Sequence, residues 1–578
     1  LSGVYDVKIR AGNNEKFESA IGFGLIGTDL TLEGPFKKGY AGSYLINYRY
    51  SVTAIIDALG LVDIGGVPKF QDAIFKVVLP TKKAGTFSFF GLGGFSNILM
   101  EDVQPDIWAT PTNGTLAADI REDFDKATHL FNTGMNHILS INDHSFLKTS
   151  LSYSSEGIED EIFEKQVITI LDDQGEFLSD SVISRMMNFQ SRIIKSTYRG
   201  ALTYSNKLNA KNKIQIGTKH TLSDYDYDQS FFQDSTASWF TAVDFKEDIG
   251  TVRNFISWKH RLTEDITIIS GFHNMNVVYN NKSTLEPRLA MKWKLNGKSS
   301  VNAGYGMHSN MESIHNYFTK LELEDGSVIE PNKDLGLLKA HHFVAGYENR
   351  FTENLMFKVE VYYQALYDLP VGNNDTSYYA TINEGLNAEY IDLVNEGTGK
   401  NYGVELTLER FLNNNYYFLI NGSVFNSTYK SLDGTERNTA YNGNYLANVL
   451  IGKEFEKLGK KKNQTLSLNF KGFVGGGKKI IPLLRDADGN LAVDPANNRF
   501  WDHDKAYEVS IEDIYTIVLS ASYKFNKPKA THEVFLSLDN ITNNKGKLAE
   551  FYDASMPGGI GYVTQFGFFP NLMYRVYF

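Results

Sequence analysis

The 578-residue chain contains no cysteine and only 13 prolines. A protein of this size normally carries several cysteines, and their absence suits an oxidising compartment in which stray thiols are a liability. Proline makes up about 2% of the chain, against a usual ~5%. Because proline cannot donate to a β-ladder, this scarcity indicates that most backbone N–H groups are committed to strand pairing.

Long apolar runs and excess positive charge are missing as well. No stretch approaches ~18 consecutive apolar residues, which excludes a transmembrane helix. The net charge of −11 argues against a general nucleic-acid-binding protein. The mean hydropathy is −0.29. A chain with these values can enter a membrane only as a β-barrel, because a barrel strand needs only one apolar residue in two.

Aromatic residues are abundant, with 39 Phe and 33 Tyr, and many of them fall in runs that alternate apolar and polar positions. Such runs occur at 43–52, 355–366, 402–410 and 514–525. They reach the ~9–11 residues that a tilted strand needs to cross a bilayer. A β-sandwich would have strands nearer ~5–6 residues. A propeller would show a period of ~40–50 residues with a recurring motif, which the chain lacks.

Tyrosine and phenylalanine gather at the ends of these apolar faces. Examples are Tyr50, Tyr363, Tyr515, Tyr523 and Phe525. Aromatic girdles at both membrane interfaces are typical of outer-membrane barrels. The alternative is that aromatic residues simply favour strands. Because the runs are also long enough to cross a bilayer, we favour the interpretation that these aromatic residues form girdles.

Short polar connections alternate with long ones. The ten short connections are 37–42, 81–85, 141–144, 206–213, 263–265, 295–299, 352–354, 413–415, 456–464 and 526–531. The long ones lie near 101–123, 156–187, 223–248, 310–338, 368–398 and 477–511. This pattern predicts an all-β fold, a transmembrane antiparallel β-barrel of about 22 strands with short periplasmic turns and long extracellular loops.

The long connections are acidic. Residues 156–180 contain nine acids and one lysine, and residues 101–123 contain six acids and one arginine. The simpler interpretation is solvation of exposed loops. The functional interpretation is that these acids create a negative electrostatic potential, which draws cationic ligands or partners toward the outer mouth.

Several segments resemble one family of outer-membrane proteins. The opening "SGVYDVKIRAGNNEKFESAIGFGLIGTDLTLEGPFKKGYAGSYLINYRYS" (2–51) resembles the plug-to-barrel junction of TonB-dependent receptors, most closely those of Bacteroidetes-type bacteria. "VEL" (404–406), after "KNYG", is similar to a mid-barrel strand of that family. "HEVFLSLDNITNNK" (532–545) and "QFGFFPNLMYRVYF" (565–578) resemble its last two strands. The resemblance covers essentially the whole chain.

The resemblance implies a 22-stranded barrel filled by an N-terminal plug, with the protein TonB pulling on a box upstream of that plug. On this basis residues 1–14 are expected to be the C-terminal remnant of a plug domain and residues 15–578 the barrel. Contact with TonB is expected if a plug and box lie upstream. Localisation in the bacterial outer membrane, surrounded by its lipid, follows from the same resemblance.

The C-terminal segment resembles the signal read by the barrel-assembly machinery. The resemblance implies that this machinery is a partner during biogenesis and that Phe578 is part of the signal. The residues of the signal share one face of an extended strand: Leu572, Tyr574, Val576 and Phe578. Arg575 falls on the opposite face, which predicts that it points into the lumen.

Two groups of residues are candidates for contact with ligand or partner. The first lies on the polar faces of the alternating runs and is predicted to line the lumen or contact a plug: Asn47, Arg49, Lys358, Glu360 and Gln364. The second is predicted to lie in extracellular loops: Trp108, Tyr225, Asp226, His308 and His315.

No motif for catalysis, metal binding or a cofactor emerges. His308 and His315, with Met307 and Met311, could hold copper or a haem, but a loop with two histidines is the simpler interpretation. His341 and His342 are adjacent, so in a strand they face opposite sides. Residues 483–494 resemble a calcium loop only partly and predict a hairpin tip. We therefore expect no enzyme, no metal and no cofactor.

These observations predict an outer-membrane receptor-transporter barrel that captures a ligand and takes it up. The alternative is a receptor-like barrel without a plug that serves as a scaffold subunit, its loops docking a surface lipoprotein or other subunits. A passive channel comes third, because a barrel of this size without a plug would leave a wide pore.

Overall fold

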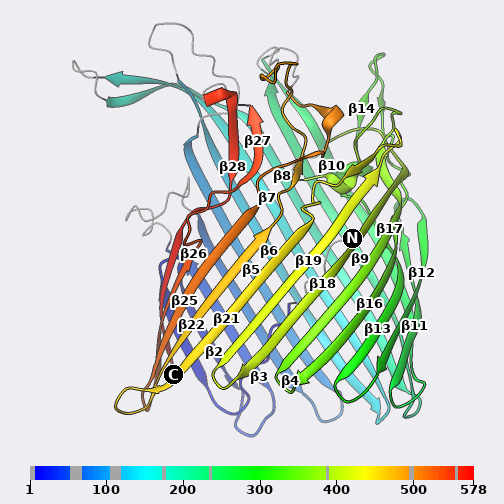
Figure 1. The fold of residues 1–578 in the computed structure, drawn as a ribbon, viewed down its shortest axis with the longest axis vertical. Coiled ribbons are helices and arrows are strands. Elements are labelled where there is room, and N and C mark those ends of the chain that lie inside the picture. The colour runs from blue at the N-terminus through cyan, green and yellow to red at the C-terminus, as the bar shows by residue number, and fades with distance from the viewer. Residues whose placement is uncertain are drawn as a thin grey trace.

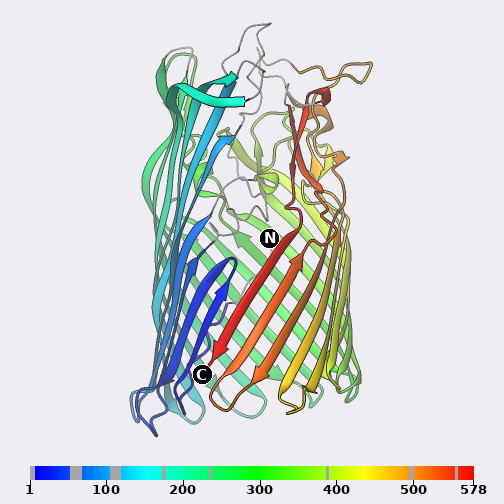
Figure 2. The ribbon, with the colours of Figure 1, turned by 90° about the vertical axis from the view of Figure 1, so that its left-hand side faces the viewer.

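A computed structural model describes residues 7–52, 68–103, 119–171, 177–233, 237–385, 389–493, 500–552 and 557–578. Within these residues, 23 strands form one antiparallel sheet. The short strand β20 (Glu436–Asn438) pairs only with β19, and the other 22 strands close into a barrel (Figures 1 and 2). The prediction of an all-β barrel of about 22 strands is therefore confirmed. No helix in the described ranges is long and apolar enough to cross a membrane.

The barrel strands follow one another around the wall in chain order. They are β1 (Glu18–Gly24), β2 (Gly27–Pro35), β3 (Ser43–Ser51), β4 (Lys69–Pro80), β5 (Thr86–Val103), β6 (Asp119–Asn142), β7 (Ser145–Leu171), β8 (Phe177–Lys207), β9 (Asn212–Gln233), β10 (Ser238–Arg261), β11 (Ile266–Val277), β12 (Lys282–Lys294), β13 (Ser299–Asn310), β16 (Leu338–Thr352), β17 (Leu355–Gly372), β18 (Leu393–Asn413), β19 (Tyr416–Lys430), β21 (Tyr445–Leu458), β22 (Gln464–Gly475), β25 (Ile514–Asn526), β26 (Thr531–Asp539) and β29 (Phe569–Tyr577).

Smaller elements lie in the connections at the upper rim of Figure 1. They are the strand pairs β14 (Leu321–Glu322) with β15 (Val328–Ile329), β23 (Lys479–Ile480) with β24 (Val509–Ser510) and β27 (Lys547–Tyr552) with β28 (Ile560–Thr564), the helix α2 (Ile314–Tyr317), and the 3-10 turns η1 (Thr381–Asn383), η3 (His503–Lys505) and η4 (Pro557–Gly559).

The barrel closes where the last strand meets the first, a junction that we call the seam. β29 pairs antiparallel with β1, from Ala20 opposite Tyr577 to Gly24 opposite Met573. The Phe578 N–H donates to the Ser19 carbonyl at 2.8 Å, so the pairing continues to the last residue of β29 and one beyond. Closure removes the open edge that a flat sheet would leave for pairing with other chains.

The register keeps one set of side chains on the inner face all the way round, because directly paired residues share a face. Asp29 is opposite Arg49, which is opposite Asp72, and Gly22 links this row to Arg575 across the seam. The other face of the sheet carries apolar residues such as Val361 and Tyr363, which are 46% and 42% exposed. Polar side chains thus face the lumen and apolar ones face outward.

All ten predicted short connections join consecutive barrel strands at one rim, the lower one in Figure 1. Two predicted long loops are wrong. Most of 156–187 belongs to β7 and β8, and most of 223–248 belongs to β9 and β10. These strands continue beyond the length that a bilayer requires, and their alternation continues with them, so acidic residues alone did not mark a loop.

The wall differs greatly in height around the barrel. β7 and β8 have 27 and 31 residues, whereas β1 and β29 at the seam have 7 and 9. Crossing the bilayer takes ~9–11 residues. The wall around β7 and β8 therefore extends well beyond the membrane, while the seam strands are no longer than the crossing requires (Figure 2).

Candidate functional site

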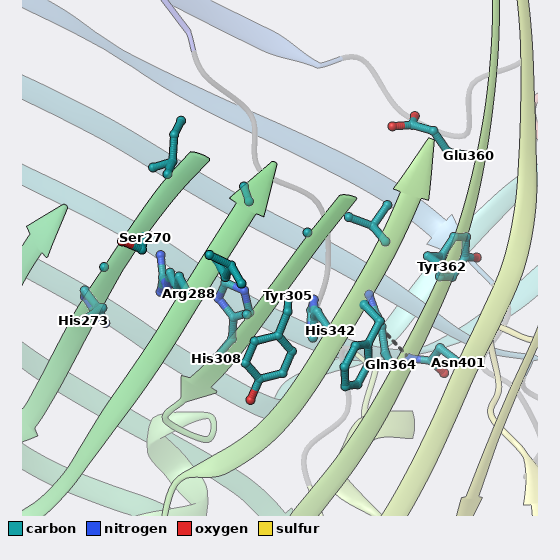
Figure 3. Close-up of a pocket in the computed structure, with 18 of the residues that line it drawn as sticks. Ser270, His273, Arg288, Tyr305, His308, His342, Glu360, Tyr362, Gln364 and Asn401 are labelled. Carbon is teal, nitrogen blue, oxygen red and sulfur yellow. Dashed lines mark hydrogen bonds between the residues drawn. The ribbon is translucent and has the colours of Figure 1, made fainter. Parts of the chain in front are cut away.

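A row of polar side chains crosses the inner face of six neighbouring strands, and we call it the histidine wall (Figure 3). Its members come from β11, β12, β13, β16, β17 and β18 and line a cavity of about 970 Å³: His273, Arg288, His308, His342, Gln364 and Asn401. Strand register brings most of them together. Arg288 is directly opposite Gly306, which is opposite His342, and His342 is opposite Gln364.

Glu286 anchors one end of the histidine wall. Its carboxylate accepts hydrogen bonds from His273 Nδ1 at 2.8 Å, Arg288 Nη2 at 2.8 Å and Ser309 Oγ at 2.5 Å. Thr284 Oγ1 donates a further, longer bond at 3.3 Å. Glu286 is only 1% exposed. A buried carboxylate needs this many donors to offset its lost hydration, and in return it fixes the position of Arg288.

The other end of the histidine wall is tied to an extracellular connection. Asn401 Nδ2 donates to Gln364 Oε1 at 3.0 Å, and Ser427 Oγ donates to Asn401 Oδ1 at 2.6 Å. Thr439, in the connection between β20 and β21, donates to Ser427 Oγ at 2.8 Å. A chain of hydrogen bonds therefore runs from the lumen to the outer mouth.

A second chamber of about 940 Å³ lies against the inner face of β3 to β9. Its wall carries two ion pairs, Arg49 with Asp72 at 2.7 Å and Lys195 with Glu156 at 3.1 Å. Tyr225 also lines the chamber, directly opposite Lys195 in the ladder of β8 with β9. Charged pairs beside aromatic faces can hold a ligand that has both polar groups and rings.

Two extracellular connections fold inward over the second chamber, and we call them the roof: residues 311–337, and residues 373–385 with 389–392. Ile314 and Tyr317 of α2 are buried in an apolar cluster with wall residues that include Phe245. His315 Nε2 lies 2.5 Å from Glu384 Oε1, joining the two connections. Tyr390 donates to Gln229 Oε1 of β9 at 3.1 Å. The roof is thus packed as a small core of its own.

Glu312 makes the packing of the roof depend on pH. Burial raises the pKa of Glu312 to about 7, and the charge of Glu384 adds to the shift. Because the pKa is raised, the packed roof favours the protonated form of Glu312. The contribution of Glu312 to the stability of the roof is therefore complete at acidic pH and is lost as the pH rises through about 7.

We expect hydrogen-exchange protection of the roof, corrected for the intrinsic pH effect, to fall by roughly tenfold between pH 5 and pH 8. Glu312→Gln should flatten this dependence, whereas Glu324→Gln, in the exposed tip of the same connection, should leave it unchanged. A wild-type roof that is equally protected at both pH values would contradict the role of Glu312.

The N-terminal segment lies against the inner face of β2 and β4. Arg10 Nη1 donates to Glu33 Oε2 at 2.6 Å, and the backbone N–H of Asn13 donates to the same oxygen at 2.8 Å. Lys76 Nζ donates to the Ile9 carbonyl at 2.6 Å. Residues 9–13 are therefore fixed to the wall. That residues 1–14 are the end of a plug domain stays a prediction.

The residues predicted to line the lumen all lie on the inner face. Asn47 donates to Thr31 Oγ1 at 2.9 Å, and Arg49 pairs with Asp72. Lys358 and Glu360 form an ion pair with each other. Their contact with a ligand or a plug stays a prediction, as does that of Gln364.

The residues predicted to lie in extracellular loops are scattered. Trp108 lies outside the described residues. Tyr225 and Asp226 belong to β9, not to a loop tip, and face opposite sides: Tyr225 lines the second chamber, while Asp226 is 3.2 Å from Lys246. His308 is also in a strand, β13, because the pairing of β13 with β16 continues to Asn310.

His308 and His315 do not share a site. His308 is beside His342, whereas His315 lies in α2 and contacts Glu384. The expectation that His341 and His342 face opposite sides is confirmed, because His341 stacks on Tyr367 of the outer face at 5.0 Å. Within the described part of 483–494 the predicted hairpin tip is confirmed, because Arg485 pairs with Leu491 and the Asp486 N–H donates to the Asn490 carbonyl at 2.9 Å.

The residues of the proposed assembly signal lie on the outer face of β29. Leu572, Tyr574 and Phe578 are 45%, 39% and 59% exposed, and Val576 shares their face by alternation. Arg575 points inward and contacts Asp29 at 2.7 Å. Recognition by the assembly machinery stays a prediction.

The sequence interpretation missed His273, Glu286, Arg288 and His342. A signal for two of them was present. Residues 285–294 alternate apolar Leu285 and Leu289 with polar Glu286 and Arg288, which is the pattern used for other runs. For His342 the sequence shows only that it is adjacent to His341, so that the two face opposite sides of a strand.

Comparison with known proteins agrees with this architecture. The family model described as "TonB dependent receptor-like, beta-barrel" matches residues 79–541. No curated protein matches the sequence.

Solved structures similar to this chain include outer-membrane receptors. The pyoverdine receptor FpvA of Pseudomonas aeruginosa bound to pyoverdine has a TM-score of 0.65 and 12% identity, covering 99% of this chain and 79% of its own. The ferric yersiniabactin uptake receptor FyuA of Yersinia pestis has a TM-score of 0.63 and 10% identity, covering 99% and 81%. The copper transporter OprC has a TM-score of 0.61 and 10% identity, covering 98% and 81%. At these identities the likeness establishes the fold.

Proposed function

Because the chain belongs to the TonB-dependent receptor family, whose β-barrels are integral to the bacterial outer membrane, we propose that it takes up a metal complex through its lumen. The observation that carries this proposal is the histidine wall. A continuous row of donors and acceptors on the inner face, beside a cavity of about 970 Å³, suits a ligand that passes through the barrel.

In this proposal the ligand first meets the second chamber or the histidine wall at the outer mouth, and the roof closes part of the entrance. The metal-complex class is suggested by similar structures, which are described as receptors for ferric chelates or as a copper transporter. The scaffold alternative finds no support in the comparisons. Contacts with TonB, the barrel-assembly machinery and a surface lipoprotein are further proposals.

Uptake can be measured in cells that lack their own receptors for iron and copper chelates. Cells expressing the full-length protein should accumulate at least one radiolabelled ferric or cupric chelate. Arg288→Ala and Gln364→Ala should lower accumulation by roughly tenfold, since each removes a fixed polar contact worth ~1.5 kcal/mol. Lys82→Ala, in an exposed turn at the opposite rim, serves as the control.

Amounts of folded barrel must be matched between variants by heat-modifiability on gels. Equal accumulation in cells with and without the protein, over a panel of such chelates, would contradict the proposed function.

A further inference from the structure

Two imidazole rings of the histidine wall lie side by side (Figure 3). The ring centroids of His308 and His342 are 4.7 Å apart, and the ring planes are tilted by 49°. The residues come from adjacent antiparallel strands, β13 and β16, at diagonal positions of the ladder. Side chains at diagonal positions are within reach of each other.

Gly306 lets the two rings approach. It is directly opposite His342, and it precedes His308 by two residues on the same strand. A Cβ added to Gly306 would lie 2.8 Å from His308 Nε2. The Nε2 of His308 therefore lies over the glycine, at the ladder position directly opposite His342. Any larger residue at 306 would push the imidazole away.

The ring nitrogens are not used by the rest of the wall. His342 Nε2 is enclosed and has no hydrogen-bond partner among the described residues. An enclosed polar atom without a partner is costly, which marks it as a place where a ligand could bind. Glu286 takes His273 and Arg288 as its own partners, so the charge of the neighbouring Arg288 is balanced.

We propose that His308 and His342 together bind one divalent transition-metal ion of borderline softness, Cu²⁺, Ni²⁺ or Zn²⁺. Neutral imidazole is a ligand that suits these ions, and two rings at this separation can each turn one nitrogen toward a shared ion. The described residues contain no group of three or more His, Asp or Glu side chains that could hold a metal. The ion therefore keeps open positions for water or for the donors of its chelator.

A site with two protein ligands is better suited to binding an ion that passes through the lumen than to holding a permanent structural ion. Structural metal sites are closed by about four protein ligands, whereas two imidazoles allow the ion to exchange. The role of the site in uptake rests on the proposed function. Binding of the metal alone does not, because it needs only the two rings and the folded wall.

Titration of the full chain without an affinity tag, purified in detergent, with Cu²⁺ tests the site directly. Electron paramagnetic resonance should show two imidazole nitrogens on the first copper bound by the wild type, and one in His308→Ala or His342→Ala. Calorimetry should show that affinity for this copper falls by at least about tenfold in either variant. His341→Ala is a matched control, since it removes the adjacent imidazole on the outer face and should bind as the wild type does.

Gly306→Ala keeps both histidines but displaces one, and it should weaken copper binding as well. Binding by His308→Ala and His342→Ala that equals the wild type would overturn the site. A receptor that takes up a chelate but shows no copper bound by two imidazoles would also overturn the site and leave the uptake function standing. Copper bound by two imidazoles in a receptor that supports no uptake would support the site and contradict the uptake function instead.

Discussion

Deleting Phe578 should lower the amount of folded barrel in the outer membrane by roughly tenfold or more, before any defect in uptake is measurable. The deletion removes the last two hydrogen bonds of the seam, from the Phe578 N–H to the Ser19 carbonyl and from the Ser19 N–H to the Phe578 carbonyl. It also removes an aromatic side chain that is 59% exposed on the outer face. The seam is the pairing that ends the open edge, so a shortened β29 leaves the barrel unclosed for longer.

The control for this prediction is Phe566→Ala. Phe566 is 78% exposed and lies outside the strands, in the connection that precedes β29. Heat-modifiability of outer-membrane fractions separates folded from unfolded barrel, and surface labelling reports insertion. If the Phe578 deletion folds to the wild-type level, closure at the seam does not depend on this residue.

Glu286→Ala should destabilise the barrel by about 3–5 kcal/mol, the usual cost of leaving the partners of a buried ion pair uncompensated. The variant removes the acceptor shared by Arg288, His273 and Ser309 in a site that is 1% exposed. Unfolding in urea, with the protein in lipid vesicles, measures the change. Uptake should fall as well, because Arg288 loses its fixed position.

Glu286→Gln should cost less, since an amide oxygen still accepts hydrogen bonds. Glu264→Ala, in an exposed turn, should leave the unfolding midpoint unchanged. An unchanged unfolding midpoint for Glu286→Ala would mean that the carboxylate does not stabilise the barrel through the histidine wall.

The strands were predictable because the period of two is local information. In 355–366 the apolar faces of the sequence and of β17 coincide, and the ten short turns marked one rim. The extents of β7 to β10 were not predictable from charge. Tyr225 and Tyr227 face the roof while Asp224 and Asp226 face outward, so the strand pattern there carries acids instead of apolar residues on its outer face.

The histidine wall was only partly predictable, because it depends on register between strands. Alternation predicts that Glu286 and Arg288 share a face of their strand. It does not predict that His273 of the previous strand is opposite Glu286. A shift of one strand by two residues preserves every face and separates His308 from His342. Alternation within its own strand predicted that Gln364 faces the lumen. It did not predict that His342 and Asn401 are its partners on the adjacent strands.

The unequal height of the wall has a consequence for the lifetime of the folded protein. The length of a ladder sets how many hydrogen bonds must break together before a strand can leave. The seam has only five paired positions, from Ala20 opposite Tyr577 to Gly24 opposite Met573. The ladder of β7 with β8 is several times longer. Local opening follows the least protected unit. We therefore expect the seam to open first and to limit the rate of unfolding, while the long strands β7 and β8 stay paired after the barrel has opened.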